Sequence, residues 1–155
     1  MEDISRKGLN KPTNRTLQTL LKGKGISPSY QRLRVLRYLH DHNNHPSVDT
    51  IYKSLSGDIP TLSKTTVYNT LKLFVDRGVV SSLTICDNEA RYDAIKTPHA
   101  HFRCRVCGRI YDVYDLKMES PSLLDAVVDG HRIEEAQLNL SGECRSCKKK
   151  HGAVS

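Results

Sequence analysis

The sequence contains no tryptophan and only two phenylalanines among its 155 residues, and 37% of the residues are hydrophobic. Such a chain has few large apolar side chains with which to build a core, so a small subdomain would gain stability from a bound metal. No apolar run approaches the roughly 18 residues that a membrane-spanning helix requires. Residues 1–21 are polar and basic and lack the apolar segment of a secretory signal.

Four of the five cysteines form two Cys-x2-Cys pairs, Cys104 with Cys107 and Cys144 with Cys147. Gly108 follows the first pair and permits a tight turn. Four thiolates in two such pairs indicate a closed tetrahedral zinc site rather than disulfides. A redox pair is the alternative, but that chemistry normally uses one pair at a helix N-terminus, and neither pair precedes a predicted helix. We interpret the fifth cysteine, Cys86, as a small strand residue.

Positive charge is concentrated near the beginning of the chain. The net charge is +7, and residues 1–40 hold nine Lys and Arg against two acids, whereas residues 96–155 hold ten against eight. A basic N-terminal half favours a polyanionic partner, although the same charge would also serve solubility.

Hydrophobic periodicity predicts helices over residues 13–22, 28–42, 48–55 and 64–76. Ser27, Ser47 and Ser63 are expected to cap the last three of them, and Gly78 to end the last. Two strands, over 79–85 and 89–94, follow with a turn at Asp87-Asn88. This order predicts a winged helix, a variant of the helix-turn-helix.

A hinge at residues 96–98 predicts a second domain. We expect residues 1–95 to form the winged-helix domain, with residues 1–24 as a basic arm and helix, and residues 96–155 to form a small α/β domain. Its predicted elements are strands over 99–103 and 109–114, a helix over 122–129 ended by Gly130, a strand over 133–140 and a basic tail over 148–151. The fold class is therefore α+β.

The outer face of the helix over residues 64–76 carries short polar side chains near its N-terminus. Thr66, Tyr68 and Asn69 could reach base edges in a major groove, while Lys64 and Lys72 could position phosphates. An ordinary solvated face has a similar composition. The preference for DNA therefore depends on the winged-helix order and on the upstream charge.

His99 and His101 are two residues apart and would project from one face of a strand. By itself this pattern is common on protein surfaces. Three further side chains, Asp93, Asp112 and His45, could complete a metal site with them.

Together these features resemble the ferric uptake regulator family of metal-dependent bacterial repressors, from about residue 25 to residue 147. The matching landmarks are Gln31-Arg32, His45-Pro46-Ser47, Ser63 with Thr66-Val67-Tyr68, Arg91-Tyr92-Asp93, His99-x-His101 and the two cysteine pairs. The resemblance implies a cytoplasmic homodimer with an N-terminal winged helix and a C-terminal dimerisation domain. It implies a repressor that binds a double-stranded DNA operator, not an enzyme with a small-molecule substrate and not a membrane protein.

The resemblance also implies two kinds of metal site and a set of DNA contacts. Structural Zn²⁺ would bind Cys104, Cys107, Cys144 and Cys147. A regulatory ion would bind His45, Asp93, His99, His101 and Asp112, a set of nitrogen and carboxylate ligands that suits Fe²⁺ or Mn²⁺ and is also compatible with Zn²⁺. The expected DNA contacts are Arg32, Lys64, Thr65, Thr66, Tyr68 and Asn69.

Within the family the sequence is most similar to the peroxide-sensing branch. Asp112 stands where iron sensors usually carry Glu, and Asn69 stands where they usually carry Arg. In that branch bound Fe²⁺ reacts with peroxide and a ligand histidine is oxidised, here His45 or His99, which releases the DNA.

The sequence departs from the family pattern at a few positions. Tyr30 replaces a common Pro, and Thr65 replaces a common Ala. Ala136 stands where many iron sensors have His, which argues against an auxiliary metal site with Glu119. Three alternatives to a peroxide sensor stay open: an iron, manganese or zinc sensor of the same family, a zinc-dependent enzyme, and an RNA-binding zinc-ribbon protein.

Overall fold

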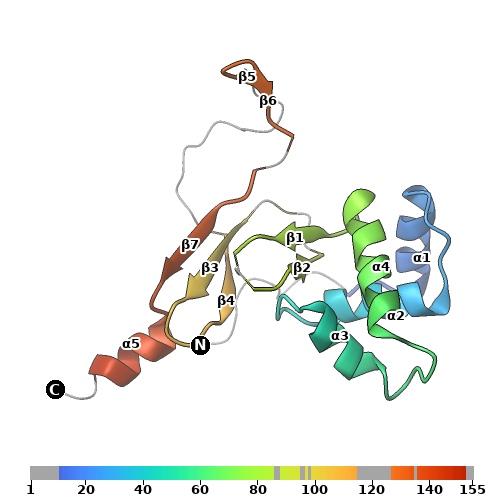
Figure 1. Ribbon diagram of the computed structural model, residues 1–155, viewed down its shortest axis with the longest axis horizontal. Coiled ribbons are helices and arrows are strands. Elements are labelled where there is room, and N and C mark those ends of the chain that lie inside the picture. Colours follow the sequence, from blue (N-terminus) through green and yellow to red (C-terminus); the bar gives the residue numbers. More distant parts are fainter. Residues whose placement is uncertain are drawn as a thin grey trace. The chain divides into compact units, whose positions relative to one another are not determined.

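The computed structural model describes residues 11–85, 88–94, 97, 99–114, 127–134 and 136–152. Its chain divides into two compact units, Met1–Thr97 and Pro98–Ser155 (Figure 1). Cys86, Glu119, Asp87 of the expected turn, two of the three hinge residues and most of the helix expected over 122–129 lie outside the described residues. No helix among the described residues is long and apolar enough to span a membrane.

The described part of the N-terminal unit contains helices α1 (Asn14–Gly23), α2 (Tyr30–Asp41), α3 (Val48–Leu55) and α4 (Lys64–Asp76). Each helix begins after a Ser or Thr whose side-chain oxygen accepts a hydrogen bond from the backbone N–H three residues later, namely Thr13, Ser29, Ser47 and Ser63. The expected start of α2 at Ser27-Pro28 is wrong. The capping oxygen belongs to Ser29, which accepts from the N–H of Arg32 at 3.3 Å.

The core of this unit is built from the apolar faces of the four helices. Its largest fully buried side chains include Leu17, Leu36, Ile51, Leu71 and Phe74. Within each helix the buried residues recur three or four positions apart, as Leu17 and Leu21 do in α1, so one stripe of each helix faces the core. Phe74 has no exposed surface, which places one of the two phenylalanines of the sequence in this core.

A hairpin of β1 (Ser81–Leu83) and β2 (Arg91–Asp93) follows α4, with Ser82 opposite Tyr92. Both strands are shorter than predicted. Gly78 ends α4 with φ +62, and the N–H of Val79 then bonds to the carbonyl of Phe74 at 2.7 Å. Val79 and Val80 are therefore buried as part of the helix end rather than paired in the hairpin. The helices and the hairpin form the predicted winged helix.

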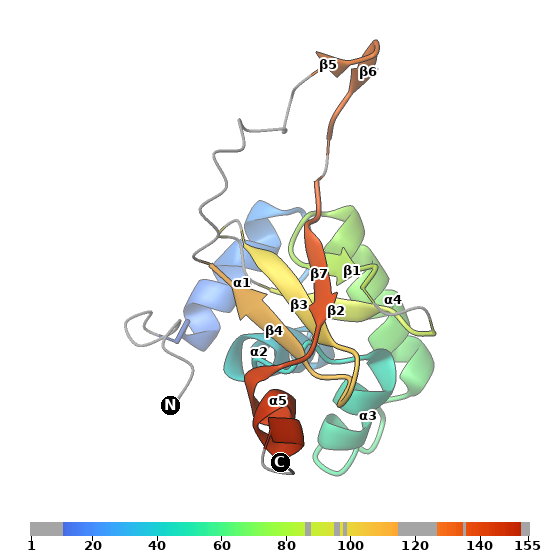
Figure 2. The same ribbon diagram turned by 90° about the vertical axis from the view of Figure 1, so that its left-hand side faces the viewer.

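The C-terminal unit contains a sheet in the order β4-β3-β7, with β3 (Ala100–Cys104) between β4 (Ile110–Val113) and β7 (Asn139–Gly142) (Figure 2). Strand β4 is antiparallel to β3, and β7 is parallel to it. A short hairpin joins β5 (Val127–Val128) to β6 (His131–Arg132), and helix α5 (Arg145–Gly152) follows β7. The α+β fold class is confirmed.

Three expectations for this unit are wrong in detail. Val127 and Val128 form a strand and not the end of a helix, because Asp129 and Gly130, with φ +50 and +82, make a tight two-residue turn between β5 and β6. The strand expected over 133–140 begins only at Asn139. The basic tail expected over 148–151 lies within α5.

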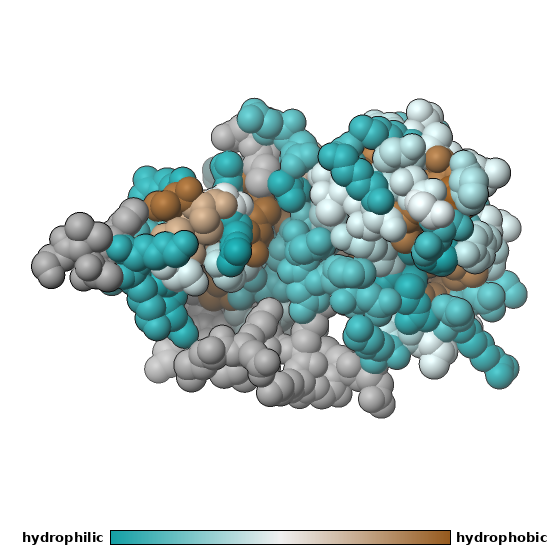
Figure 3. All heavy atoms as spheres, turned by 90° about the horizontal axis from the view of Figure 1, so that it is seen from below, coloured by the Kyte–Doolittle hydropathy of each residue, from teal (hydrophilic) through white to brown (hydrophobic). Residues whose placement is uncertain are grey.

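Hydrophilic side chains cover much of the described surface in the view of Figure 3, and hydrophobic ones form smaller areas. Such a surface agrees with the low hydrophobic content of the chain.

Candidate metal centres and nucleic-acid interface

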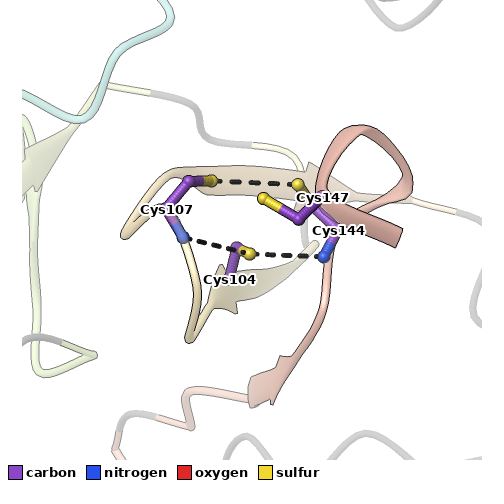
Figure 4. Close-up of side chains that lie close together, drawn as sticks. All are labelled: Cys104, Cys107, Cys144 and Cys147. Atoms are coloured by element: carbon purple, nitrogen blue, oxygen red, sulfur yellow. Dashed lines mark hydrogen bonds between the residues drawn. The ribbon is translucent and has the colours of Figure 1, made fainter. Parts of the chain in front are cut away.

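Four cysteine side chains converge at one end of the β4-β3-β7 sheet (Figure 4). Cys104 is the last residue of β3, and it lies opposite Gly142 of β7, two residues before Cys144. Parallel pairing of these strands therefore brings the two cysteine pairs together. Their sulfur atoms lie within 4.8 Å of one another. The expectation that neither pair adjoins a helix is wrong, since Cys147 lies in the first turn of α5.

The sulfur geometry suits a zinc ion. Tetrahedral Zn–S bonds of about 2.3 Å place neighbouring sulfurs about 3.8 Å apart. The Sγ atoms of Cys107 and Cys144 are 3.8 Å apart. The backbone N–H groups of Cys107 and Cys144 donate to the Sγ of Cys104 at 3.5 and 3.3 Å, as expected where a thiolate must be stabilised.

The thiol groups differ in acidity. The backbone N–H of Cys107 lowers the pKa of Cys104. The backbone N–H of Cys147, followed by the hydroxyl of Tyr111, lowers the pKa of Cys144 to about 6. Burial raises the pKa of Cys147 to about 12. A full set of four thiolates therefore needs the charge of a divalent cation to form at neutral pH.

A second cluster in the same unit consists of His99, His101 and Asp112. The Nε2 atoms of the two histidines are 3.0 Å apart, and the Oδ1 atom of Asp112 lies 3.4 Å from the first and 3.8 Å from the second. Pairing of β3 with β4 sets His101 directly opposite Asp112. The three side chains are only 5–7% exposed. Two imidazoles and one carboxylate thus lie close enough together to provide three ligands for one metal ion.

Tyr114 contacts two members of this cluster, Asp112 and His99. Its hydroxyl lies 3.4 Å from the Oδ2 atom of Asp112, a long hydrogen bond, and its ring stacks on His99 with centroids 5.2 Å apart. Sequence reasoning missed Tyr114. Its spacing of two residues from Asp112 on a strand places both side chains on one face, and this signal could have found it.

His45 and Asp93 lie together in the N-terminal unit. His45 is in the turn between α2 and α3, has φ +43 and is only 4% exposed. Its carbonyl accepts from the guanidinium of Arg91 at 3.3 Å, and the N–H of Tyr92 donates to the carbonyl of Pro46 at 3.1 Å. These bonds fasten β2 to the turn, so that ligand atoms of His45 and Asp93 lie within 4.8 Å of each other. Left-handed backbone at a buried histidine is a feature that clusters at functional sites.

The face of α4 that sequence reasoning assigned to DNA is largely exposed. This α4 face comprises Lys64, Thr65, Thr66, Tyr68 and Asn69, and only Thr66 is half-buried. The hydroxyl of Thr66 lies 2.8 Å from that of Ser63 and so takes part in the helix cap. Lys64 pairs with Asp49 of α3, a contact between two helices that no sequence spacing indicates. The sixth predicted contact, Arg32, donates to the carbonyl of Ser27 at 2.8 Å and thereby fixes the loop before α2.

The chain combines a winged helix with a cluster of four cysteines and with imidazole and carboxylate groups suited to bind metal. This combination is typical of one class, the metal-responsive DNA-binding proteins. The chain belongs to the ferric uptake regulator family, whose family model matches residues 23–141.

The similar proteins include peroxide regulators. The chain is 37% identical to the peroxide operon regulator of Bacillus subtilis (strain 168) over 130 residues, which covers 84% of this chain and 90% of that protein. It is 36% identical to the peroxide-responsive repressor PerR of Staphylococcus aureus (strain Mu50) over 135 residues, covering 84% and 88%.

Solved structures have the same fold. The ferric uptake regulator Fur of Helicobacter pylori matches with a TM-score of 0.67 at 21% identity, covering 90% of this chain and 97% of that one. PerR from Streptococcus pyogenes, whose structure was described as a basis for peroxide sensing and gene regulation, matches with a TM-score of 0.50 at 29% identity, covering 94% and 99%. The family expected from the sequence is confirmed, and the peroxide-sensing branch is its best supported part.

Proposed function

We propose that this protein is a homodimeric bacterial repressor, located in the cytoplasm, that binds a DNA operator when a regulatory metal is bound and releases it on exposure to peroxide. The observation that carries the proposal is the division of the imidazole and carboxylate ligands between the two units of the chain. His45 and Asp93 belong to the winged-helix unit, and His99, His101 and Asp112 belong to the other.

An ion that takes ligands from both sets would favour one arrangement of the two units. A ligand shifts such an equilibrium only by its difference in affinity between the arrangements. An ion held by only one set would bind with nearly the same affinity in every arrangement of the two units. Residues 1–95 would then act as the DNA-binding domain and residues 96–155 as the dimerisation domain, with the α4 face and Arg32 on the DNA of each half-site.

The two clusters would have separate roles. The four cysteines would hold Zn²⁺ permanently, because a closed tetrathiolate site has no open position and its binding energy contributes to folding. The mixed nitrogen and oxygen cluster suits Fe²⁺ or Mn²⁺. Iron bound there would supply the redox chemistry by which peroxide oxidises a nearby imidazole. The imidazoles expected to be oxidised are those of His45, in the winged-helix unit, and His99, in the C-terminal unit. Oxidation of either one would remove one metal ligand from its unit.

Metal-titrated DNA binding tests the proposal. The probe is a duplex selected from randomised DNA by the manganese-loaded protein. His99→Ala should abolish the metal-dependent part of binding and leave the zinc content and dimer unchanged. His131→Ala, which changes an exposed histidine of the β5–β6 hairpin, is the matched control and should bind normally. Normal metal-dependent binding by His99→Ala would refute the regulatory site.

A peroxide challenge tests the second part. The iron-loaded protein should gain one oxygen atom on a peptide containing His45 or His99 and lose DNA binding, whereas the manganese-loaded protein should do neither. Loss of binding without oxidation of a histidine would contradict the peroxide mechanism. Retention of binding by the oxidised iron form would instead favour an iron, manganese or zinc sensor of the same family.

A further inference from the structure

Asp49 is placed between two lysines beside the α4 face. It lies in the first turn of α3, where its Oδ1 atom pairs with Lys64, the first residue of α4. Its Oδ2 atom pairs with Lys53, one turn later in α3, at 2.5 Å. The Nζ atom of Lys64 also lies 5.8 Å from the ring centroid of Tyr52. One carboxylate thus holds the ammonium group at the start of α4.

The contact between Asp49 and Lys64 is open to solvent. The Lys64 side chain is 59% exposed and that of Asp49 is 38% exposed. Exposed ion pairs of this kind contribute little net stability, because water screens them and both side chains lose freedom. Such a pair can therefore exchange one partner for another anion at little cost.

Lys64 lies at a position where a nearby anion is stabilising. A helix N-terminus carries partial positive charge, so a lysine there is at the unfavourable end of the helix dipole. Helix α4 has no acidic residue in its own first turn. In the free protein the compensating anion comes from the neighbouring helix, as Asp49. In a DNA complex a phosphate at the same place would serve the same purpose.

We propose that Asp49 competes with a DNA phosphate for Lys64 and thereby sets the affinity of the α4 face for DNA. This inference rests on the proposed DNA-binding function. When Lys64 moves to a phosphate, it releases a counterion from the DNA, and Asp49 keeps only Lys53 as its partner. While Asp49 is present, Lys64 therefore contributes less than one full phosphate contact to the affinity and to its salt dependence.

The Asp49→Asn variant tests the competition. It removes the charge and keeps the side-chain shape, so Lys64 is available to the phosphate. DNA should bind more tightly, and the slope of log affinity against log salt should become steeper by up to about 0.9, the value for one full phosphate contact. Fluorescence anisotropy with the manganese-loaded dimer at several salt concentrations measures both quantities. Thermal unfolding of each variant shows that it is folded.

A double-mutant cycle with Lys64→Gln separates this effect from a general loss of negative charge. In the Lys64→Gln background, Asp49→Asn should change neither the affinity nor the slope appreciably. Asp58→Asn is the matched control, because Asp58 is an exposed acid of the same unit that pairs with Arg34 at 2.8 Å, away from Lys64. It should leave the slope unchanged. Lys53→Gln, which removes the other partner of Asp49, should weaken binding slightly or not at all.

Equal effects of Asp49→Asn with and without Lys64 would overturn the inference, since they would show simple charge repulsion. Weaker binding by Asp49→Asn would also overturn it, and would show that Asp49 orients Lys64 instead. These results leave the proposed function intact. The proposed function itself would be refuted if the unmodified protein bound no selected duplex at low salt with Fe²⁺, Mn²⁺ or Zn²⁺. The inference would then fail with it.

Discussion

The backbone N–H of Cys144 donates a hydrogen bond to the Sγ atom of Cys104 across 3.3 Å, although the two residues are 40 positions apart. The parallel pairing of β3 with β7 makes this contact, with Cys104 opposite Gly142. Pairing of the two strands therefore brings the cysteines together, and the hydrogen bond between Cys144 and Cys104 in turn links the strand ends. Phe102 is the partly buried hydrophobic residue that packs against the cysteines there.

Cys104→Ser should release the zinc and destabilise the C-terminal unit, because structural zinc binding contributes directly to folding free energy. We expect loss of the bound zinc, a lower unfolding temperature and a weaker dimer. Elemental analysis, thermal unfolding and analytical ultracentrifugation measure these three effects. Ser146→Ala changes one of the two exposed residues between Cys144 and Cys147 and should retain zinc and stability. A zinc-free Cys104→Ser protein as stable as the unmodified one would contradict the structural role.

The grouping of the four cysteines could be predicted from spacing alone, because two Cys-x2-Cys pairs are typical of a tetrathiolate metal site. The helix at Cys147 could not. The segment of α5 is rich in lysine and has no apolar stripe, so hydrophobic periodicity does not indicate its helix. The β5–β6 hairpin did have a local signal, because Asp129-Gly130 is a typical two-residue hairpin turn, but a short apolar run before a glycine also fits a helix end.

The contacts that position functional groups were harder to predict than the groups themselves. His99, His101 and Asp112 could be named from the sequence as candidate ligands, chiefly through the family resemblance. The pair of Asp49 with Lys64 joins residues of two helices whose packing depends on the whole core, so no sequence spacing indicates it. The cap of α2 at Ser29 instead of Ser27 shows a similar limit, since both serines are chemically able to cap and the chain path decides between them.

Tyr111→Phe should make the zinc site more sensitive to acid. The hydroxyl of Tyr111 donates to the Cys144 thiolate and is one cause of the low pKa of that cysteine, about 6. A hydrogen bond to the charged form favours the thiolate, so its loss raises this pKa and lets protons compete with zinc at higher pH.

The midpoint of acid-induced zinc release should therefore move to higher pH in Tyr111→Phe, as followed with a chromogenic zinc indicator. Tyr30→Phe, which alters an exposed tyrosine of the other unit, is the control and should not shift it. A midpoint that stays the same, or moves to lower pH, would show that Tyr111 does not stabilise the thiolate.

Tyr114→Leu should weaken the regulatory site without affecting the zinc site. The variant removes both the hydrogen bond to Asp112 and the stack on His99. Outer residues that orient metal ligands typically change metal affinity by about 10–100-fold. Because the hydrogen bond is long, we expect the lower end of that range, about tenfold, for Mn²⁺ measured by electron paramagnetic resonance. Tyr114→Phe keeps the stack and should lose less. Equal and unchanged affinities in both variants would exclude this role.

Ser63→Ala should destabilise the start of α4 and with it the DNA-binding unit. The Ser63 hydroxyl accepts from the N–H of Thr66 at 3.0 Å and contacts the Thr66 hydroxyl at 2.8 Å. Replacement of such a cap by alanine typically costs about 1 kcal/mol of unfolding free energy. Urea denaturation should show this loss. Ser54→Ala, which removes an exposed serine hydroxyl bonded to the carbonyl of Thr50 within α3, should cost much less, because no helix end depends on it. If both variants lose the same stability, the cap is not what fixes the start of α4, and the Lys64 position then needs another explanation.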